Sequence, residues 1–312
     1  MAKIRILKPG LLSTLQDMGR VGFQKFGMPV SGAMDTNALQ IANLLVGNAP
    51  GEACIEATLM GPEIECLADG EMAVSGAMTD VFINQQAIDR HVNHQLRKGD
   101  VISFGPVRRG CRLYIAFAGG FDVPCVMGSK STYLRGKLGG YKGRVLQQGD
   151  EIKLGAVTQY KKRRLMNDGP RLPNPVNNIR IIAAAESKAF TFNGIEKFLN
   201  EIYTVSAQSD RMGYRLTGPP VKHLQGADIL SAGIANGSIQ VPAHGEPIIM
   251  LADRQTIGGY TKIANVISID LPLLGQLKAG DEIRFVEVRL DEAHQLMQEQ
   301  KRYINSAVKT ID

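Results

Sequence analysis

Residues 254–260 read Arg-Gln-Thr-Ile-Gly-Gly-Tyr, and residues 135–141 read Arg-Gly-Lys-Leu-Gly-Gly-Tyr. Further along each half, the pattern Leu-x-x-Gly-Asp-Glu-Ile occurs at 146–152 and again at 277–283, and a third copy with valine in place of glutamate lies at 96–102. A hairpin turn before a strand accounts for each Gly-Asp pair taken alone, but it does not account for fragments that recur in the same order. The repeated order therefore predicts two divergent copies of one β-barrel-like domain.

Glycine recurs along the whole chain and separates short apolar runs. The sequence has 34 glycines, and this spacing is typical of many short strands joined by tight turns. Strands are predicted at 101–104, 113–117, 179–183, 248–251 and 282–288. Helices are few: one begins after an N-capping Asp35 and stops at Gly47, and another covers the C-terminal end. The predicted fold class is mainly β with a few short helices.

A change of composition marks the boundary between the two halves. Residues 161–164 are Lys-Lys-Arg-Arg, and Asp-Gly-Pro at 168–170 precedes Pro-Asn-Pro at 173–175. Charge, glycine and proline together oppose both a helix and a central strand. The predicted parts are an N-terminal β-barrel lobe at 1–155, a basic Pro/Gly-rich linker at 156–177, a C-terminal β-barrel lobe at 178–290 and a helix at 291–305.

The charge of the chain argues against a polyanionic partner. The formal net charge is +6, from 36 Lys and Arg against 30 Asp and Glu. Four of those positive charges lie in the run 161–164, which leaves +2 for the rest of the chain. Neither a nucleic-acid nor a membrane surface is therefore expected as a partner. The run itself could attract an acidic partner, although a solvated linker is the commoner arrangement.

Location and metal content are predicted from what the sequence lacks. No apolar run reaches the ~18 residues that cross a bilayer, and the N-terminus lacks the apolar segment of a signal peptide. The four cysteines are scattered, with no Cys-x-x-Cys pair and no histidine at zinc-finger spacing. We therefore expect a cytoplasmic protein with buried free thiols and no metal site.

A polar segment in the first half combines hydroxyl groups with cations. Gly128-Ser129-Lys130-Ser131-Thr132 is close to the end of a Walker A loop, but Ser129 stands where glycine must precede the lysine. Neither Gly-x-Ser-x-Gly nor His-Glu-x-x-His occurs. Hydroxyl and cationic groups together suit a carboxylate or phosphate, while a polar turn explains them equally well. The predicted substrate-binding residues of this segment are Ser129, Ser131, Thr132 and Arg135.

The second half is richer in such groups. Residues 209–215 contain two arginines and a carboxylate, and further polar groups follow at 240 and 253–260. Guanidinium, amide and hydroxyl groups can orient an amide-containing ligand and stabilise charge on its oxygen. A buried ion-pair network is the alternative explanation for each motif singly. The predicted catalytic residues are Asp210, Arg211, Arg254, Gln255 and Thr256, and the predicted substrate-binding residues are Arg215, Gln240, Gly258, Gly259 and Tyr260.

These segments resemble the KipA family, also described as allophanate hydrolase subunit 2-like, which includes the C subunit of bacterial 5-oxoprolinases. The resemblance extends to about residue 293 and rests on several long motifs in order. The motifs are Gln-Asp-x-Gly-Arg at 16–20, Ser-Gly-Ala-Met-Asp at 31–35, Ala-Gly-Gly-Phe-Asp at 118–122, Ser-Asp-Arg-Met-Gly-Tyr-Arg-Leu at 209–216 and Asp-Arg-Gln-Thr-x-Gly-Gly-Tyr at 253–260.

The resemblance implies a fold, partners and an activity. The fold would be two cyclophilin-like β-barrel domains. The partners would be the KipI-like B subunit of a 5-oxoprolinase together with its A subunit, and the complex would use ATP to open 5-oxoproline to L-glutamate. ATP would belong to the complex, and this chain would be active only within it. Arginines that neutralise phosphoryl charge would suit such a reaction.

Two other functions are compatible with the same family. One is the carboxyltransferase subunit of a biotin-dependent urea carboxylase, although this chain has no biotin-attachment sequence and no biotin carboxylase domain. The other is a regulatory module that binds a KipI-like protein and antagonises its inhibition of a histidine kinase. Neighbouring genes for the A and B subunits would favour the oxoprolinase, and a biotin carboxylase gene would favour carboxyl transfer.

Overall fold

The structure, a computed structural model, describes residues 2–156 and 160–311. The chain divides into two compact units. The N-terminal unit draws on the segment up to Arg20, on Ser31–Leu172 and on the segment from Lys301, and the C-terminal unit draws on Val21–Val30 and Pro173–Gln300. The main division therefore falls after residue 172, inside the range predicted as a linker.

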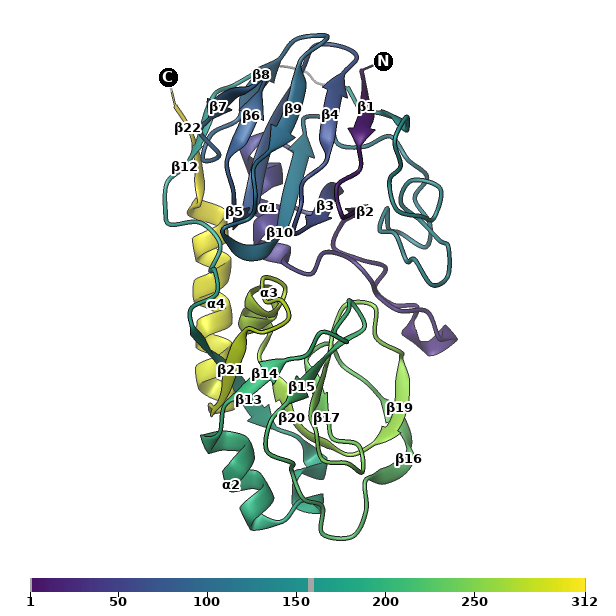
Figure 1. Ribbon diagram of the computed structural model, residues 1–312, viewed down its shortest axis with the longest axis vertical. Helices are drawn as coiled ribbons and strands as arrows, with labels where there is room; N and C mark the ends of the chain where they lie inside the picture. The colour runs from purple at the N-terminus through teal and green to yellow at the C-terminus, as the bar shows by residue number, and fades with distance from the viewer. Residues whose placement is uncertain (1, 157–159, 312) are drawn as a thin grey trace. The chain divides into compact units, whose positions relative to one another are not determined.

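Two antiparallel sheets form the N-terminal unit (Figure 1). The first has the order β11-β1-β4-β9-β6-β7 and the second has the order β2-β3-β10-β5-β8. The first sheet consists of β1 (Lys3–Lys8), β4 (Glu63–Cys66), β6 (Val81–Ile83), β7 (Gln86–Ile88), β9 (Val101–Phe104) and β11 (Glu151–Lys153). The second consists of β2 (Leu12–Gln16), β3 (Cys54–Thr58), β5 (Gly70–Met78), β8 (His94–Leu96) and β10 (Arg109–Phe117).

The alternation of β1 shows how these sheets form a core. Ile4 and Ile6 are buried, whereas Arg5 between them points outward and pairs with Glu65 and Glu151 of the neighbouring strands, at 3.1 and 2.7 Å. Because successive side chains point to opposite faces of a strand, this pattern places one face of each sheet in the core. A single apolar cluster accordingly contains residues from both sheets.

The helix α1 (Thr36–Leu45) covers the second sheet and begins as predicted. The Asp35 carboxylate accepts a hydrogen bond from the Ala38 N–H at 2.9 Å, which is the contact expected of an N-cap. The Asp35 N–H donates to the Tyr114 hydroxyl at 2.7 Å, and that hydroxyl donates to Glu56 at 2.6 Å. The start of the helix is therefore fixed to the sheet by buried polar contacts, and its apolar face packs on β5 and β10.

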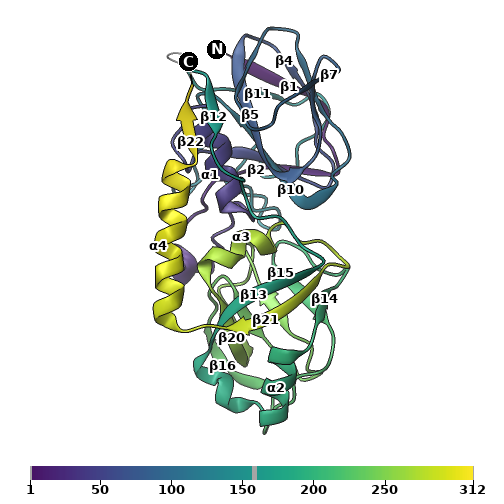
Figure 2. The ribbon, with the colours of Figure 1, turned by 90° about the vertical axis from the view of Figure 1, so that its left-hand side faces the viewer.

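The basic run contains a strand. Arg163–Leu165 form β12, which pairs with β22 (Val308–Thr310) near the C-terminus (Figure 2). The Arg163 N–H donates to Asn93 at 2.7 Å, and its guanidinium lies 3.5 Å from Glu71. Part of the range predicted as a linker is thus an edge strand tied to the N-terminal unit. The C-terminal helix α4 (Leu290–Ser306) closely matches the predicted one.

A closed seven-stranded barrel forms the C-terminal unit, in the order β13-β20-β17-β18-β15-β14-β21. The mainly β prediction is confirmed. The barrel strands are β13 (Val176–Ala183), β14 (Tyr203–Val205), β15 (Gly213–Thr217), β17 (Ser238–Gln240), β18 (Ile248–Met250), β20 (Lys262–Val266) and β21 (Glu282–Glu287). The other elements are a two-stranded ribbon of β16 (Asp228–Gly233) and β19 (Ile257–Tyr260), helices α2 (Phe192–Asn200) and α3 (Leu271–Leu274), and short 3-10 turns η1 (Gln24–Phe26), η2 (Ala185–Ala189) and η3 (Ser268–Asp270).

The repeated Gly-Asp pairs adopt the same turn. Asp100, Asp150 and Asp281 each accept a hydrogen bond from the backbone N–H three residues earlier, at 2.7, 2.8 and 2.9 Å. The glycines before them have φ of 92°, 85° and 89°, in the left-handed region that favours glycine. A strand follows each turn closely, namely β9, β11 and β21. The carboxylate closes the turn and the glycine permits its backbone, so the sequence pattern has a direct physical cause.

The Gly-Gly-Tyr fragments adopt different structures in the two units. In the C-terminal unit, Ile257–Tyr260 form β19, whereas Gly139 and Gly140 have φ of 67° and 55° in a loop of the N-terminal unit. These fragments therefore look alike in sequence without sharing a local fold.

Three of the four cysteines are buried, as predicted, and all four are free thiols. Burial, followed by the nearby negative charge of Asp100, raises the pKa of Cys66 to about 12. Because the thiolate is the nucleophile and the metal ligand, Cys66 is chemically inert at neutral pH.

The turn glycines yield a stability prediction. Gly280 has φ of 89° with no neighbouring atom within 4 Å of an added Cβ, so Gly280→Ala tests backbone strain alone. We expect a loss of about 1–2 kcal/mol in the free energy of unfolding, measured by urea denaturation. Gly226→Ala is the control, since Gly226 also has open space around it but no positive φ. Equal losses in both variants would contradict the interpretation.

Candidate functional site

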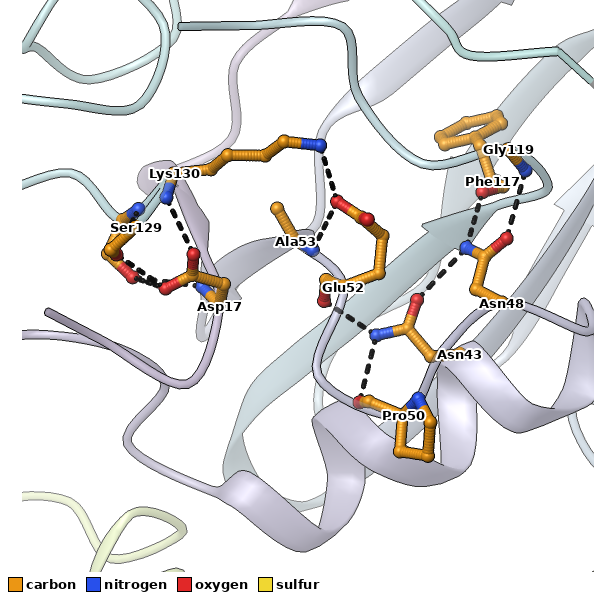
Figure 3. A network of polar contacts seen from close by, with 11 residues as sticks. Asp17, Asn43, Asn48, Pro50, Glu52, Ala53, Phe117, Gly119, Ser129 and Lys130 are labelled. Carbon is orange, nitrogen blue, oxygen red and sulfur yellow. Dashed lines mark hydrogen bonds and ion pairs between the residues drawn. The ribbon is translucent and has the colours of Figure 1, made fainter. Parts of the chain in front are cut away.

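The carboxylate of Asp17 is the centre of a polar network in the N-terminal unit (Figure 3). Its Oδ1 accepts hydrogen bonds from the hydroxyls of Ser129, at 2.7 Å, and Ser131. Its Oδ2 accepts from the Lys130 N–H at 2.6 Å. Charge-assisted hydrogen bonds of this kind are stronger than neutral ones. The hydroxyls predicted to bind substrate are thus engaged within the protein, and their substrate-binding role stays a prediction.

The network continues from Lys130 toward helix α1 (Figure 3). Lys130 Nζ lies 2.7 Å from Glu52 Oε1, and both side chains are partly exposed. The Asn43 amide donates to the Glu52 carbonyl oxygen at 2.7 Å, and its own oxygen accepts from the Asn48 amide at 3.0 Å. Asn48 in turn accepts from the Gly119 N–H at 2.9 Å. Side chains and backbone groups from distant parts of the N-terminal unit therefore hold one another in place.

Close packing brings the Gly139-Gly140 loop against the same segment. A Cβ at Gly140 would lie 1.8 Å from Thr132 Oγ1, and one at Gly139 would lie 2.1 Å from the Ser131 carbonyl oxygen. Thr132 Oγ1 itself donates to the Leu15 carbonyl at 3.0 Å. Only glycine permits this approach. Arg135, by contrast, is exposed and lies outside this packed core of the segment.

Arg211 and Asp253 form a buried ion pair in the C-terminal unit. Arg211 Nε and Nη2 donate to the two oxygens of Asp253 at 2.9 and 3.3 Å, and each side chain is only 8% exposed. The Asp253 N–H also donates to the Arg211 carbonyl at 2.9 Å. This two-pronged geometry is the one that suits guanidinium and carboxylate groups. The pair ties together two segments that are 42 residues apart in the sequence.

Arg254 points to backbone carbonyls. Its Nε donates to the Ile234 carbonyl at 3.0 Å and its Nη1 to the Leu251 carbonyl at 3.2 Å. The side chain is buried, and burial lowers the pKa of Arg254. Its charge is therefore held in a desolvated setting between the ribbon and the barrel strands.

Gln240 and Gly258 meet beside Arg254. A Cβ at Gly258 would lie 2.7 Å from Ile234 Cδ1 and 3.0 Å from Gln240 Nε2, so the absence of a side chain makes room for protein atoms. Gln240 Nε2 points to the Tyr260 carbonyl at 3.5 Å, a long contact. Because Arg254 bonds to the Ile234 carbonyl, these residues are contiguous. The structure thus brings Gln240, Arg254 and Gly258 together, and their role in a site stays a prediction.

The remaining predicted residues lie nearer the surface. Asp210 accepts from the Met212 N–H at 2.8 Å and so shapes a turn. Thr256 is half-buried, and its carbonyl accepts from the Ile234 N–H at 3.0 Å. The exposed side chains are Asp210, Arg215, Gln255 and Tyr260, and Gly259 is half-buried on the ribbon. These exposed groups are the ones that a ligand or another polypeptide can reach.

Lys262, a buried lysine directly beyond the 253–260 motif, is not among the predicted site residues. Lys262 pairs with Gln240 across β20 and β17, and its Nζ lies 3.0 Å from Glu186 Oε1. The pair is largely buried. A lysine two residues after Tyr260 could have been noticed, but no pattern in the sequence points to Glu186 as its partner. Asp17 and Asp253 belong to the motifs at 16–20 and 253–260, yet their hydrogen-bond partners and the burial of Asp253 depend on the fold.

Metal binding and membrane spanning find no support in the part of the chain that the structure describes. No group of three or more His, Cys, Asp or Glu side chains there is arranged to hold a metal ion. Among the same residues, no helix has the length and apolar character needed to cross a bilayer.

Comparison with known proteins gives consistent matches over most of the chain. Residues 26–287 match the family described as carboxyltransferase domain, subdomain A and B. The chain is 37% identical to the C subunit of the 5-oxoprolinase of Escherichia coli (strain K12) over 300 residues, which cover 96% of each protein. It is 35% identical to the same-named subunit of Haemophilus influenzae, covering 99% of each.

Similarity to solved structures extends to a larger enzyme. The urea carboxylase of Kluyveromyces lactis matches with a TM-score of 0.90 and 31% identity, over 97% of this chain and 29% of that one. The match is therefore to one part of a much longer polypeptide.

The buried ion pair yields a prediction that tests whether Arg211 stabilises the fold. Arg211→Met would leave Asp253 buried without its main partner, and we expect a loss of about 3–5 kcal/mol in the free energy of unfolding. Arg215→Met is the matched control, because Arg215 is exposed and four residues away; its expected effect is within about 0.5 kcal/mol. Urea denaturation followed by circular dichroism measures both. Similar stabilities in the two variants would contradict a structural role for the pair.

Proposed function

The chain belongs to the carboxyltransferase-domain family, subdomains A and B, and we propose that it acts as the C subunit of an ATP-dependent 5-oxoprolinase. One observation carries this proposal: the similarity to two proteins named as the C subunit of 5-oxoprolinase covers 96–99% of both chains in each comparison. Matching over nearly the full length of both relatives favours the role that their names give them. The urea amidolyase of Saccharomyces cerevisiae, by contrast, is matched over only 18% of its length.

The proposed reaction opens the lactam ring of 5-oxoproline to give L-glutamate. A lactam is an unreactive amide, so transfer of the γ-phosphoryl group of ATP to its oxygen would create a leaving group. Water would then attack the ring carbon, the ring C–N bond would open, and ADP and phosphate would be released. Such a sequence needs positive groups near the phosphoryl oxygens and a site that holds the carboxylate of the substrate.

The buried arginines of this chain are suited to positioning other residues of the site in that reaction. Arg211 and Arg254 contact internal partners, which hold the segment 253–260 in one conformation. Gln255 and Tyr260 of the same segment are exposed, and Arg215 lies on the neighbouring part of the barrel. We assign the direct contacts with substrate or partner to these exposed groups, and the positioning of the segment to the buried ones. A rigid support of this kind improves the placement of reacting groups.

The A and B subunits of the oxoprolinase, the latter KipI-like, are the partners in this proposal. The β16–β19 ribbon exposes apolar side chains beside the arginine motif: Leu230 is 94% exposed and Ile257 is 61% exposed. Exposed apolar groups on one short ribbon favour its burial against another protein. We therefore assign this ribbon to the contact with the B subunit.

Reconstitution tests the proposed function directly. The purified chain alone should form no glutamate from 5-oxoproline and ATP, whereas the chain mixed with the A and B subunits should form glutamate and ADP in equal amounts. Omission of this chain should abolish the activity. Glutamate formation by the A and B subunits alone would contradict the proposal. Carboxyl transfer dependent on a biotinylated protein, with no oxoproline cleavage, would favour the urea carboxylase type of function instead.

The ribbon yields a separate prediction for assembly. Leu230→Asp places a charge where an apolar contact is expected, and we expect the affinity for the B subunit to fall at least about tenfold. Isothermal titration calorimetry measures the affinity. Phe192→Asp is the control, because Phe192 is 77% exposed on α2 of the same unit but outside the ribbon. Wild-type affinity in Leu230→Asp would exclude the ribbon from the interface.

A further inference from the structure

A cavity of about 360 Å³ lies in the N-terminal unit, and none of its lining residues belongs to the predicted site. Its lining comes from α1, from β5 and the adjoining residues 79–81, from residues 87–91, from Arg108 and from residues 165–172. The apolar part of the lining includes Ile41, Leu45, Val74 and Leu165. Ligand pockets typically measure about 300–1,000 Å³ and combine apolar walls with a few polar groups. This cavity therefore has the size for a small molecule.

Arg90 supplies a positive charge to the wall of this cavity. Its Nη1 and Nη2 donate to the carbonyls of Ala77 and Gly76 at 2.9 and 2.6 Å. Its Nε is buried and has no hydrogen-bond partner, and no carboxylate of the described residues forms an ion pair with it. Two neutral carbonyls do not compensate a full charge. An arginine that serves the fold alone would be expected to have its buried donors paired.

The electrostatic setting of Arg90 is unfavourable to its own charge. Burial, and then the positive charge of Arg108, lowers the pKa of Arg90, while Asp89 acts in the opposite direction. The guanidinium nevertheless stays protonated at neutral pH, because its intrinsic pKa is so high. The free protein thus holds a cation in a setting that disfavours it. An anion in the cavity would relieve that cost.

The carboxylates around the cavity already have cationic partners or lie in solvent. Asp80 accepts from Arg108 with both oxygens, at 2.5 and 2.9 Å. Asp89 lies 3.4 Å from the Arg164 guanidinium and 3.5 Å from His91. Asp168 is exposed, so water and salt screen its charge. Arg90 therefore remains as a charged group of the lining that forms no ion pair among the described residues, beside the apolar side chains of α1 and β5.

We propose that this cavity binds a small monocarboxylate with an apolar body, such as a medium-chain fatty acid. The carboxylate would face Arg90, and the hydrocarbon would contact the side chains of α1 and β5. This inference does not rest on the proposed oxoprolinase function, and the isolated chain suffices to test it.

Binding of simple probes to the isolated chain tests the proposal without any mutation. Hexanoate, hexanol, hexylamine and acetate differ in charge and in tail, and isothermal titration calorimetry compares them. We expect one saturable site for hexanoate, with hexanol at least about tenfold weaker, hexylamine weaker still, and no measurable binding of acetate. Equal binding of hexanol and hexanoate would show an apolar pocket without anion selection and overturn the proposal. Absence of saturable hexanoate binding at millimolar concentration would overturn it as well.

Variants of Arg90 locate the site. Arg90→Gln should weaken hexanoate binding about tenfold or more, while hexanol binding stays near that of the wild type; Arg90→Lys should retain part of the selectivity. Arg97→Gln is the control, since it removes the same charge from an exposed arginine that does not line the cavity. Hexanoate affinity unchanged in Arg90→Gln would overturn the proposal. Should Arg90→Gln fail to fold, as judged by circular dichroism, the comparison of the four probes decides.

Discussion

The carboxylate of Asp17 joins loops that are 112–114 residues away in the sequence, and it illustrates the constraint on which this fold depends. Long glycine-rich segments lose much conformational entropy when they are ordered, and they offer few apolar contacts in return. Hydrogen bonds to the half-buried Asp17 carboxylate compensate part of that loss. Because these contacts share one carboxylate, the loss of any partner weakens the network.

The C-terminal unit also orders its loops around charged groups, but there the central charges are positive and donate hydrogen bonds. Here the buried groups at the centre are guanidinium groups, and their acceptors are Asp253 and the backbone carbonyls of Ile234 and Leu251. The Arg254 guanidinium donates to the carbonyl of Ile234, the residue directly after β16. This bond fixes the end of β16 relative to the barrel. Arginine and aspartate, which are typical of active sites, thus also stabilise the fold here. The residues that can contact a ligand are the members of each motif that remain exposed.

This division explains how one motif can support both roles. In the segment 253–260, the first two residues are buried, whereas Gln255, Ile257 and Tyr260 are exposed. Anchored residues hold the backbone, and their exposed neighbours present chemical groups with little freedom to move. The arrangement suits a subunit whose surface completes a site together with another polypeptide.

Local sequence was enough to predict the mainly β class, the N-cap at Asp35, the C-terminal helix and the three Gly-Asp turns. Each of these depends on contacts within a few residues, where side-chain chemistry and allowed backbone angles act directly. The partners of Asp17 and Lys262, the strand within the basic run and the different structures of the two Gly-Gly-Tyr fragments came only from the folded chain. Those features depend on residues that are distant in the chain. The partner of a charged side chain is therefore decided by which groups the packed backbone brings within hydrogen-bond distance.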